Sequence, residues 1–219
     1  MSNDKHARQG AVGGIVFAIL TFVGFAIVIP KPPDVDSSAA TFAAYYTDHQ
    51  NAIRAGLTIV GVGIFFFIWF LGSLRSALAA AEGASGRLSS VAFGAGLVAA
   101  AGLIVGLGAA ETAAFRPNDV DPGVTRALND FFVVLGAPAA TALAAFFAAT
   151  AMVGFRFGAL PGWASWVSGV AAVGQLPAIG TSLTTTGAFA ADGALGLFVP
   201  VFTLLIGLVV ISVALMRSR

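Results

Sequence analysis

Six long apolar stretches constrain this chain more than any other feature of its sequence. A helix needs about 20 apolar residues to cross a bilayer core about 30 Å thick, and the only charged residue inside these six stretches is Arg54, near the start of the second. We therefore expect an all-α fold, a polytopic transmembrane helical bundle that forms a single domain over residues 1–219. The six expected spans are Ala11–Pro30, Ile53–Leu74, Leu88–Ala110, Phe131–Phe155, Trp163–Thr184 and Leu195–Met216.

The composition agrees with a membrane location and excludes several classes of protein. Hydrophobic residues make up 58% of the chain and charged residues 10%, whereas soluble domains carry about 25% charged residues. The pattern excludes a soluble enzyme, a disordered protein and a nucleic-acid binder, and the net charge of +1 supplies no polybasic arm. With no cysteine, the chain has no disulfide and no cysteine-ligated metal. We expect no cofactor.

The distribution of basic residues predicts the orientation. Cytoplasmic loops of membrane proteins carry an excess of Lys and Arg. If both termini are cytoplasmic, the inner segments hold Lys5, Arg8, Arg75, Arg87, Arg156, Arg217 and Arg219, and the outer segments hold Lys31, Arg54, Arg116 and Arg126. This asymmetry favours a multi-pass protein with both termini in the cytoplasm. The absence of cysteine and the inner positive charge fit a bacterial plasma membrane.

The first outer loop predicts a short amphipathic helix before the second span. Asp36, Ser37 or Ser38 can cap its start. Its aromatic residues then recur at helical spacing and share one face: Phe42, Tyr45, Tyr46 and His49. We expect this helix on the outer surface, with its aromatic face at the level of the lipid headgroups. In the second outer loop, Asn129 or Asp130 is a candidate cap for the fourth span.

Small residues predict which helices pack closely, because lipid is as apolar as leucine and hydrophobicity alone does not join helices in a membrane. Gly102, Gly106 and Ala110 recur at four-residue spacing in the third span, and Thr141, Ala145 and Ala149 do so in the fourth. We expect these two helices to lie centrally. The sixth span, rich in large aliphatic residues, is expected to face lipid.

The fifth span is unusually polar and contains a proline. Pro177 lacks an N–H and should leave the carbonyl of Val173 without its helical partner, and such a group in hydrocarbon must be satisfied by protein or water. Either the helix is simply kinked, or it lines an outward-facing polar cavity. The residues that would form that cavity are Gln175, Pro177, Thr181, Ser182 and Glu111. Glu111 is either a solvated or Arg-paired residue or, if buried, a coupling site for transport.

His49 is a weak candidate for chemistry. Catalytic zinc sites use three protein ligands, so one available histidine argues for an interfacial anchor and against a metal site. A catalytic group of Ser182, His49 and an acid at the outer face is conceivable, but no Gly-x-Ser-x-Gly motif accompanies it. The expected protein is therefore not an enzyme, with an outer-face hydrolase left open.

Several segments resemble a known group of sequences. The runs FAAYYTDHQNAIRAG from Phe42, FFFIWFLGSLRSALAAAEG, RLSSVAFGAG and FRFGALPGWASWVSGVAAV place aromatic, Gly and Arg residues at helix ends. In this they resemble Ala/Gly-rich six-helix integral membrane proteins of unknown function that are common in actinobacteria. The resemblance covers roughly residues 42–173. It implies the six-helix architecture and no activity or catalytic residue.

Two functions remain open. The first is a non-catalytic accessory or assembly subunit of the plasma membrane, whose partners are membrane lipids and either another membrane protein or further copies of this chain. The second is a small transporter or ligand-binding membrane protein with the polar cavity on the fifth span. The two functions predict different effects of replacing Gln175 with leucine. An accessory subunit should tolerate the change, whereas a transporter or ligand-binding protein should lose its function.

Overall fold

The computed structural model describes residues 2–217, with side chains from residue 10 onward, and every regular element in the described part is a helix. The α-helices are α1 (Ser2–Phe22), α2 (Ala39–Asp48), α3 (Gln50–Glu82), α4 (Arg87–Phe115), α5 (Pro122–Phe157), α6 (Gly162–Gln175) and α7 (Val199–Arg217). Short π-helices follow α1 (Val23–Val28) and precede α7 (Ala194–Phe198), and 3-10 helices occupy Gly83–Ser85, Pro117–Asp119 and Leu176–Ser182. The side chains of Lys5, Arg8 and Arg219, used above for orientation, lie outside the described residues.

Five helical segments are long and apolar enough to cross a membrane. They are Gly10–Val28, Gln50–Ser85, Arg87–Phe115, Pro122–Phe157 and Ala194–Arg217, and they correspond to five of the six expected spans. The remaining stretch, 163–184, is not one continuous α-helix: α6 ends at Gln175, and Leu176–Ser182 continues as a 3-10 helix with Pro177 in its first turn. The proline therefore divides this stretch where the sequence predicts a kink.

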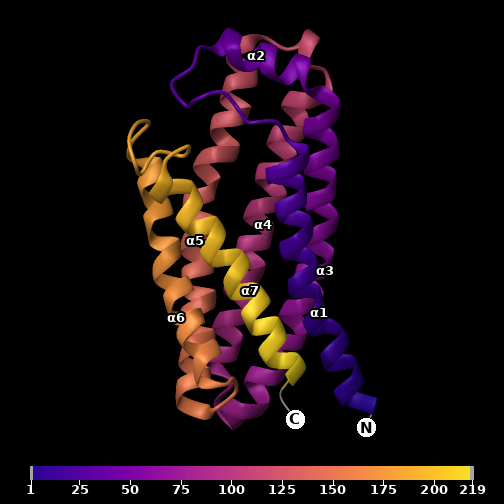
Figure 1. Cartoon of the computed structure of the whole chain (residues 1–219), viewed down its shortest axis with the longest axis vertical. Helices are drawn as coiled ribbons and strands as arrows, with labels where there is room; N and C mark the ends of the chain where they lie inside the picture. The colour runs from indigo at the N-terminus through magenta and orange to yellow at the C-terminus, as the bar shows by residue number, and fades with distance from the viewer. Residues whose placement is uncertain (1, 218–219) are drawn as a thin grey trace.

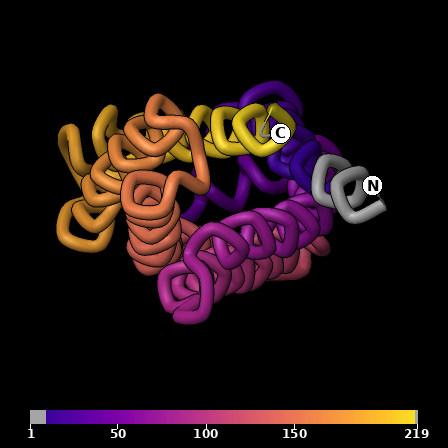
Figure 2. Tube along the Cα trace, turned by 90° about the horizontal axis from the view of Figure 1, so that it is seen from below, coloured from indigo at the N-terminus to yellow at the C-terminus, as the bar shows by residue number. Residues whose placement is uncertain are grey.

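The long helices run side by side, and α2 lies across one end of the bundle (Figure 1). The most extensive contacts join α4 to α5, α1 to α3, and α5 to α6, while α7 packs against α6 and α1. Seen along the bundle, α7 lies on one side and the turn between α3 and α4 on the opposite side (Figure 2). We call the two ends the α2 end and the opposite end.

Small residues bring the helix backbones together, as predicted for α4 and α5. A Cβ built on Gly106 would lie 3.0 Å from the Phe132 ring, and one on Gly102 would lie 3.4 Å from the Ala139 methyl group. A second close crossing joins α1 to α3, where a Cβ on Gly13 would overlap the carbonyl oxygen of Phe66. Here glycine is required by contact with backbone, which cannot move aside as a flexible side chain can.

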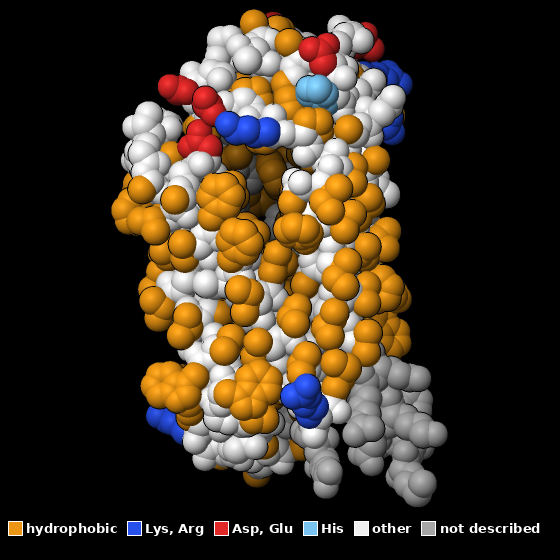
Figure 3. All heavy atoms as spheres, viewed as in Figure 1, with side chains coloured by type: hydrophobic (Ala, Val, Ile, Leu, Met, Phe, Trp, Pro, Cys, Tyr) orange, Lys and Arg blue, Asp and Glu red, His pale blue; other side chains and the backbone are white. Residues whose placement is uncertain are grey.

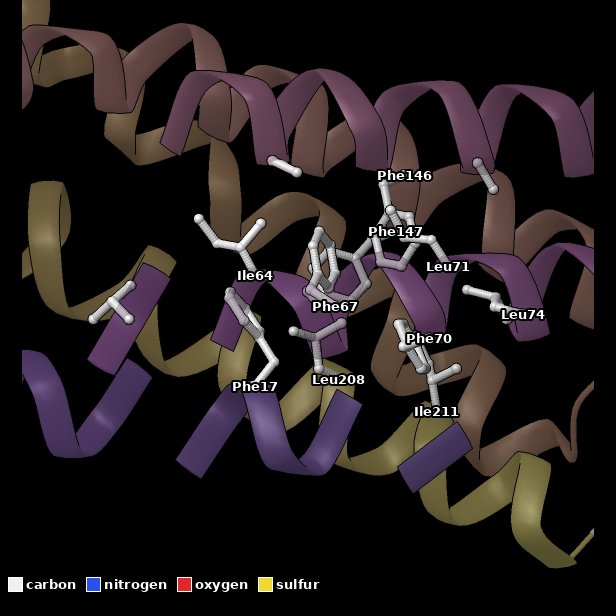
Figure 4. Packing of buried hydrophobic residues seen from close by; sticks show 14 of the residues in the cluster. Phe17, Ile64, Phe67, Phe70, Leu71, Leu74, Phe146, Phe147, Leu208 and Ile211 are labelled. Carbon is white, nitrogen blue, oxygen red and sulfur yellow. The ribbon is translucent and has the colours of Figure 1, made fainter. Parts of the chain in front are cut away.

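The core is centred on α3, which supplies more of the large buried side chains than α4 does. Phe67 lies in the middle of this core, with its ring 4.8 Å from that of Phe17 on α1 and 6.4 Å from that of Phe146 on α5 (Figure 4). The α4–α5 pair is thus tightly packed, but the centre of the bundle belongs to α3. The small side chains of α4 explain this, since they permit close approach without filling volume.

Helix α7 is buried on one face only. Leu208 and Ile211 are fully buried, whereas Phe202 and Ile206 on the other face are more than half exposed. A Cβ on Gly207 would lie 2.6 Å from the Phe147 ring of α5. The expected lipid-facing character of this helix therefore applies to half of its surface.

Helix α5 begins nine residues before the expected fourth span. Asp121 caps it by accepting the N–H of Gly123 at 2.7 Å, and Pro122 occupies the first turn, where a missing N–H costs nothing. The expectation that Asn129 or Asp130 caps this helix is wrong, because both lie in its interior. The segment 122–130 is more polar than the rest of α5. Its low hydropathy resembles that of a loop, but the helix continues through it.

Candidate functional site

The residues proposed to line a polar cavity lie in three different surroundings. Gln175, at the end of α6, is fully buried and donates through Nε2 to the carbonyl of Pro200 at 2.9 Å and to Oγ1 of Thr203 at 3.0 Å. Both acceptors lie near the start of α7. The Gln175 amide therefore joins two helix ends and is already occupied by protein acceptors.

The carbonyl of Val173 is not left free by Pro177. The N–H of Leu176 donates to it in a 3-10 turn, which removes the need for water or another helix at this point. Thr181 Oγ1 likewise donates to the carbonyl of Ala178 at 2.8 Å, and Ser182 is exposed. Pro177 itself lies in a shallow, almost wholly apolar depression with Leu176, Ile179, Gly180, Leu183 and Phe189.

Glu111 lies on α4, away from this segment, and is paired with an arginine. The Nε atom of Arg54 on α3 lies 3.1 Å from Glu111 Oε1, and the guanidinium also lies over the Phe115 ring at 5.2 Å. Both side chains are about 40% exposed, so the pair is a surface ion pair with little effect on stability. Gln175 binds α7 and Glu111 binds α3, so the structure does not bring them together.

The strongest concentration of specific polar contacts lies instead at the α2 end. Helix α2 exists as expected, and Ser38 caps it by accepting the N–H of Thr41 at 3.2 Å. Two of its aromatic side chains, however, face the bundle and not lipid: Phe42 and Tyr46 are buried, while Tyr45 is half-buried and donates to the carbonyl of Pro30 at 2.7 Å. That expectation is corrected, because an apolar face at the end of a bundle can cover helix ends as well as meet lipid.

Tyr46 connects α2 to the interior of α5. Its hydroxyl donates to Asn129 Oδ1 at 3.2 Å, and both side chains are buried. Burial raises the pKa of Tyr45 to about 12, and burial, reinforced by the adjacent Tyr45, raises the pKa of Tyr46 well above its ordinary value. Both phenols are therefore held in the protonated form, which is the form that donates these hydrogen bonds.

Arg126 on α5 holds the loop that leads into α2. Its two terminal nitrogens donate to the carbonyls of Ser37 and Val35, its guanidinium lies over the Phe42 ring at 5.4 Å, and Asp130 lies 3.6 Å from its Nε. The N–H of Val35 in turn donates to Asp192 Oδ2 at 3.2 Å. Residues 30–38 are thereby attached to two distant parts of the chain.

The end of α4 is closed in the same region. Gln50 Nε2, at the start of α3, donates to the carbonyls of Ala114 at 3.0 Å and Phe115 at 3.1 Å. These are carbonyls that a helix end leaves without partners of its own. We refer to α2, residues 30–38 and their contacts with Arg126, Asn129 and Gln50 as the α2 cap.

His49 belongs to the rim of the α2 cap. It is exposed, and its ring lies against that of Tyr45 with centroids 5.3 Å apart. Helix α2 packs on α5, α4, α3 and the segment Pro117–Asp119, whereas Ser182 lies in the 3-10 segment after α6. Within the described residues, no group of three His, Cys, Asp or Glu side chains is arranged to hold a metal ion.

Sequence reasoning identified α2 but not the residues that hold it. The sequence pattern places Arg126 and Asn129 in a loop. The pair Asp121-Pro122, which is typical of a helix start, is the one local feature that would have placed both residues on the first turns of a helix. Comparison with known proteins adds no assignment: no family model, curated protein or solved structure matches this chain. The resemblance to actinobacterial six-helix proteins stays a prediction.

Proposed function

We propose that this chain is a multi-pass protein of a bacterial plasma membrane that acts without catalysis, as an accessory or assembly subunit. The observation that carries the proposal is the state of its interior polar groups. Among the buried polar side chains on α5 and α6, those of Gln175, Thr150 and Ser168 donate to helix carbonyls, and Gln175 donates also to Thr203. Groups committed in this way stabilise helix contacts and are not available to a substrate.

The topology we propose has six spans with both termini in the cytoplasm. Helix α6 and the 3-10 segment after it hold 14 and 7 residues. At 1.5 and 2.0 Å per residue they extend about 35 Å together, enough to cross the bilayer core. Arg75, Arg87, Arg156 and Arg217 all lie toward the opposite end of the bundle, and acidic side chains gather at the α2 end (Figure 3). Lys31, Arg54, Arg116 and Arg126 belong to the α2 end, so these eight basic residues are evenly divided. The bias that favours an outward-facing α2 cap comes from Lys5, Arg8 and Arg219 in the two terminal segments, which raise the inner count to seven against four.

The partners of such a subunit are membrane lipids and either a second membrane protein or further copies of this chain. The α2 cap supports this proposal because it is fixed by hydrogen bonds at several points and so presents a constant surface. Its outward residues Ala40, Thr41, Ala44 and Thr47 are small and exposed, which allows close approach of another protein.

The test is native mass spectrometry of the tagged protein extracted from its own host membrane in mild detergent. A second protein at fixed stoichiometry, retained in Gln175→Leu and Glu111→Gln variants, supports the accessory function and names the partner. A lone chain or homo-oligomer carrying a discrete non-lipid mass, lost in Gln175→Leu while the fold is kept, contradicts it. That result would favour the alternative of a small transporter or ligand-binding protein.

A further inference from the structure

One inward face of α5 is covered at both ends and open between them. Asn129, Gly136 and Phe147 share this face, because residues seven and eleven positions apart fall on the same side of a helix. Asn129 is covered by Tyr46 of α2, and Phe147 is covered by Gly207 of α7. Gly136 between them is exposed, and a Cβ added to it would meet nothing within 4 Å.

Gly136 does not lie on the outer surface of the bundle. The exposed large apolar residues of α5 include Val134 and Met152, which are 48% and 36% exposed. A step of two residues turns a helix by about 200°, so Gly136 lies on the side opposite Val134. The space in front of Gly136 is therefore an internal hollow and not the general lipid-facing surface.

Helices α1 and α7 form the two sides of this hollow. They cross where Gly14 contacts Ser212 and separate toward the α2 end (Figure 1). Both run into π-helical segments there, Val23–Val28 and Ala194–Phe198. Figure 3 shows the resulting opening on this face, below the α2 end, with a Lys or Arg side chain at its upper edge and hydrophobic side chains around its sides.

The walls that can be named are apolar. Phe25, in the π-helical segment after α1, stacks on Phe132 of α5 with ring centroids 6.1 Å apart, and it remains 36% exposed. The mouth lies between helices that are apolar enough to span a membrane, so the medium outside it is bilayer hydrocarbon.

We propose that this hollow, which we call the α1–α7 cleft, binds an acyl chain of a membrane lipid from the leaflet at the α2 end. The cleft is closed at one end by the α1–α7 crossing and at the other by the α2 cap. A spanning helix of a partner, about 10 Å wide, would have to pass through both closures. A flexible hydrocarbon chain enters sideways from the leaflet and needs no opening at either end.

The proposal does not depend on the accessory function, since a bound lipid is compatible with either reading of the protein. Its test uses the full chain in nanodiscs of phosphatidylcholine, part of which carries a diazirine in one acyl chain. After irradiation, we expect adducts on Phe25 and Phe132. Adducts on Val134, on the outer face of the same helix, measure ordinary contact with surrounding lipid and serve as the internal reference.

A blocking variant and a matched control separate the cleft from the surface. Gly136→Leu fills the open space and should abolish the adduct on Phe132 while leaving that on Val134 unchanged. Gly72→Leu is the control, because Gly72 is also exposed with no atom within 4 Å of a built Cβ. It should leave both adducts unchanged. An unchanged Phe132 adduct in Gly136→Leu, or no Phe132 adduct in the parent chain, overturns the proposal.

Two other occupants give distinct results. Because the chain contains no cysteine, Gly136→Cys introduces a unique thiol, and we expect a charged methanethiosulfonate reagent in the water not to modify it. Rapid modification would mean a water-filled cleft and would overturn the proposal. So would nanodiscs that hold two chains and lack the Phe132 adduct, because a second copy would then occupy the space.

Discussion

The hydroxyl of Tyr46 donates to Asn129 Oδ1 across 83 residues of sequence, and both side chains are buried. This contact joins the short helix α2 to the first turns of α5. It is the only hydrogen bond described for either side chain, so the position of α2 over the bundle depends on it together with Phe42 and Arg126.

Replacing Tyr46 with phenylalanine should destabilise the protein while preserving its fold. The change keeps the ring but leaves the buried Asn129 oxygen without its donor, which costs on the order of 1–3 kcal/mol. The measurement is the free energy of unfolding in detergent or lipid, followed by circular dichroism. Thr47→Val is the matched control: the 3.4 Å contact of Thr47 with Asn118 is exposed, and its loss should change stability by less than half as much. Equal effects of the two variants would contradict the assigned role of Tyr46.

The chain should resist ionisation of its tyrosines as long as α2 is docked. It contains two tyrosines, and both lie on α2. In the unfolded chain they ionise near pH 10, whereas burial raises the pKa of Tyr45 to about 12 and that of Tyr46 in the same direction. The folded state thus retains protons that the unfolded state has lost. The stabilising contribution is complete below about pH 10 and declines as the pH rises toward 12.

Tyrosinate absorbance in the near ultraviolet measures this directly. The native protein should show almost no tyrosinate at the pH where the denatured protein is half ionised. The signal then reports on α2 alone, because no other segment contributes to it. A native titration that coincides with that of the denatured chain would mean that α2 is not docked.

The α1–α3 crossing should be intolerant of even a methyl group. Gly13→Ala places a Cβ against the carbonyl oxygen of Phe66, which is backbone, so α1 must move away from α3. We expect a loss of about 2 kcal/mol or more, in the range found for overpacked cores. Gly61→Ala is the control, because a Cβ there meets nothing within 4 Å. It should stabilise α3 by up to about 1 kcal/mol. Unfolding free energies of the two variants check the difference in sign.

The five helices that are long and apolar enough to cross a membrane could be predicted from the sequence, because a run of about twenty apolar residues with almost no charge is typical of such helices. The helix boundaries could not: α5 extends through Arg126 and Asn129, whose polarity imitates a loop although their side chains bind other segments. The direction of the aromatic face of α2 was also beyond the sequence. Periodicity identifies an apolar face, but lipid and protein interior are both apolar, so it does not say which of them the face meets.

The candidate cavity residues also show what a local sequence pattern does and does not predict. Pro177 correctly marked the point where the helix changes, since its effect acts within a few residues. The partners of Gln175 lie 25 and 28 residues away on α7, and no local pattern announces them. The sequence around Gly136 does not predict the open space beside it, because that space depends on the arrangement of the other helices.

The α2 cap also has a consequence for the order in which the protein is made. The partner of Val35 and Ser37 is Arg126, which is synthesised 91 residues after Val35 and 89 residues after Ser37. Val35 also binds Asp192, which lies a further 66 residues along the chain. At about 5–20 residues per second, the 157 residues between Val35 and Asp192 take roughly 8–30 s to synthesise. The aromatic face of α2 is without its partners for the earlier part of this interval, because Asn129, which binds Tyr46, is made 83 residues later. During biogenesis the nascent chain therefore presents a surface that the mature protein hides, and an insertion factor or chaperone would have this window to bind it.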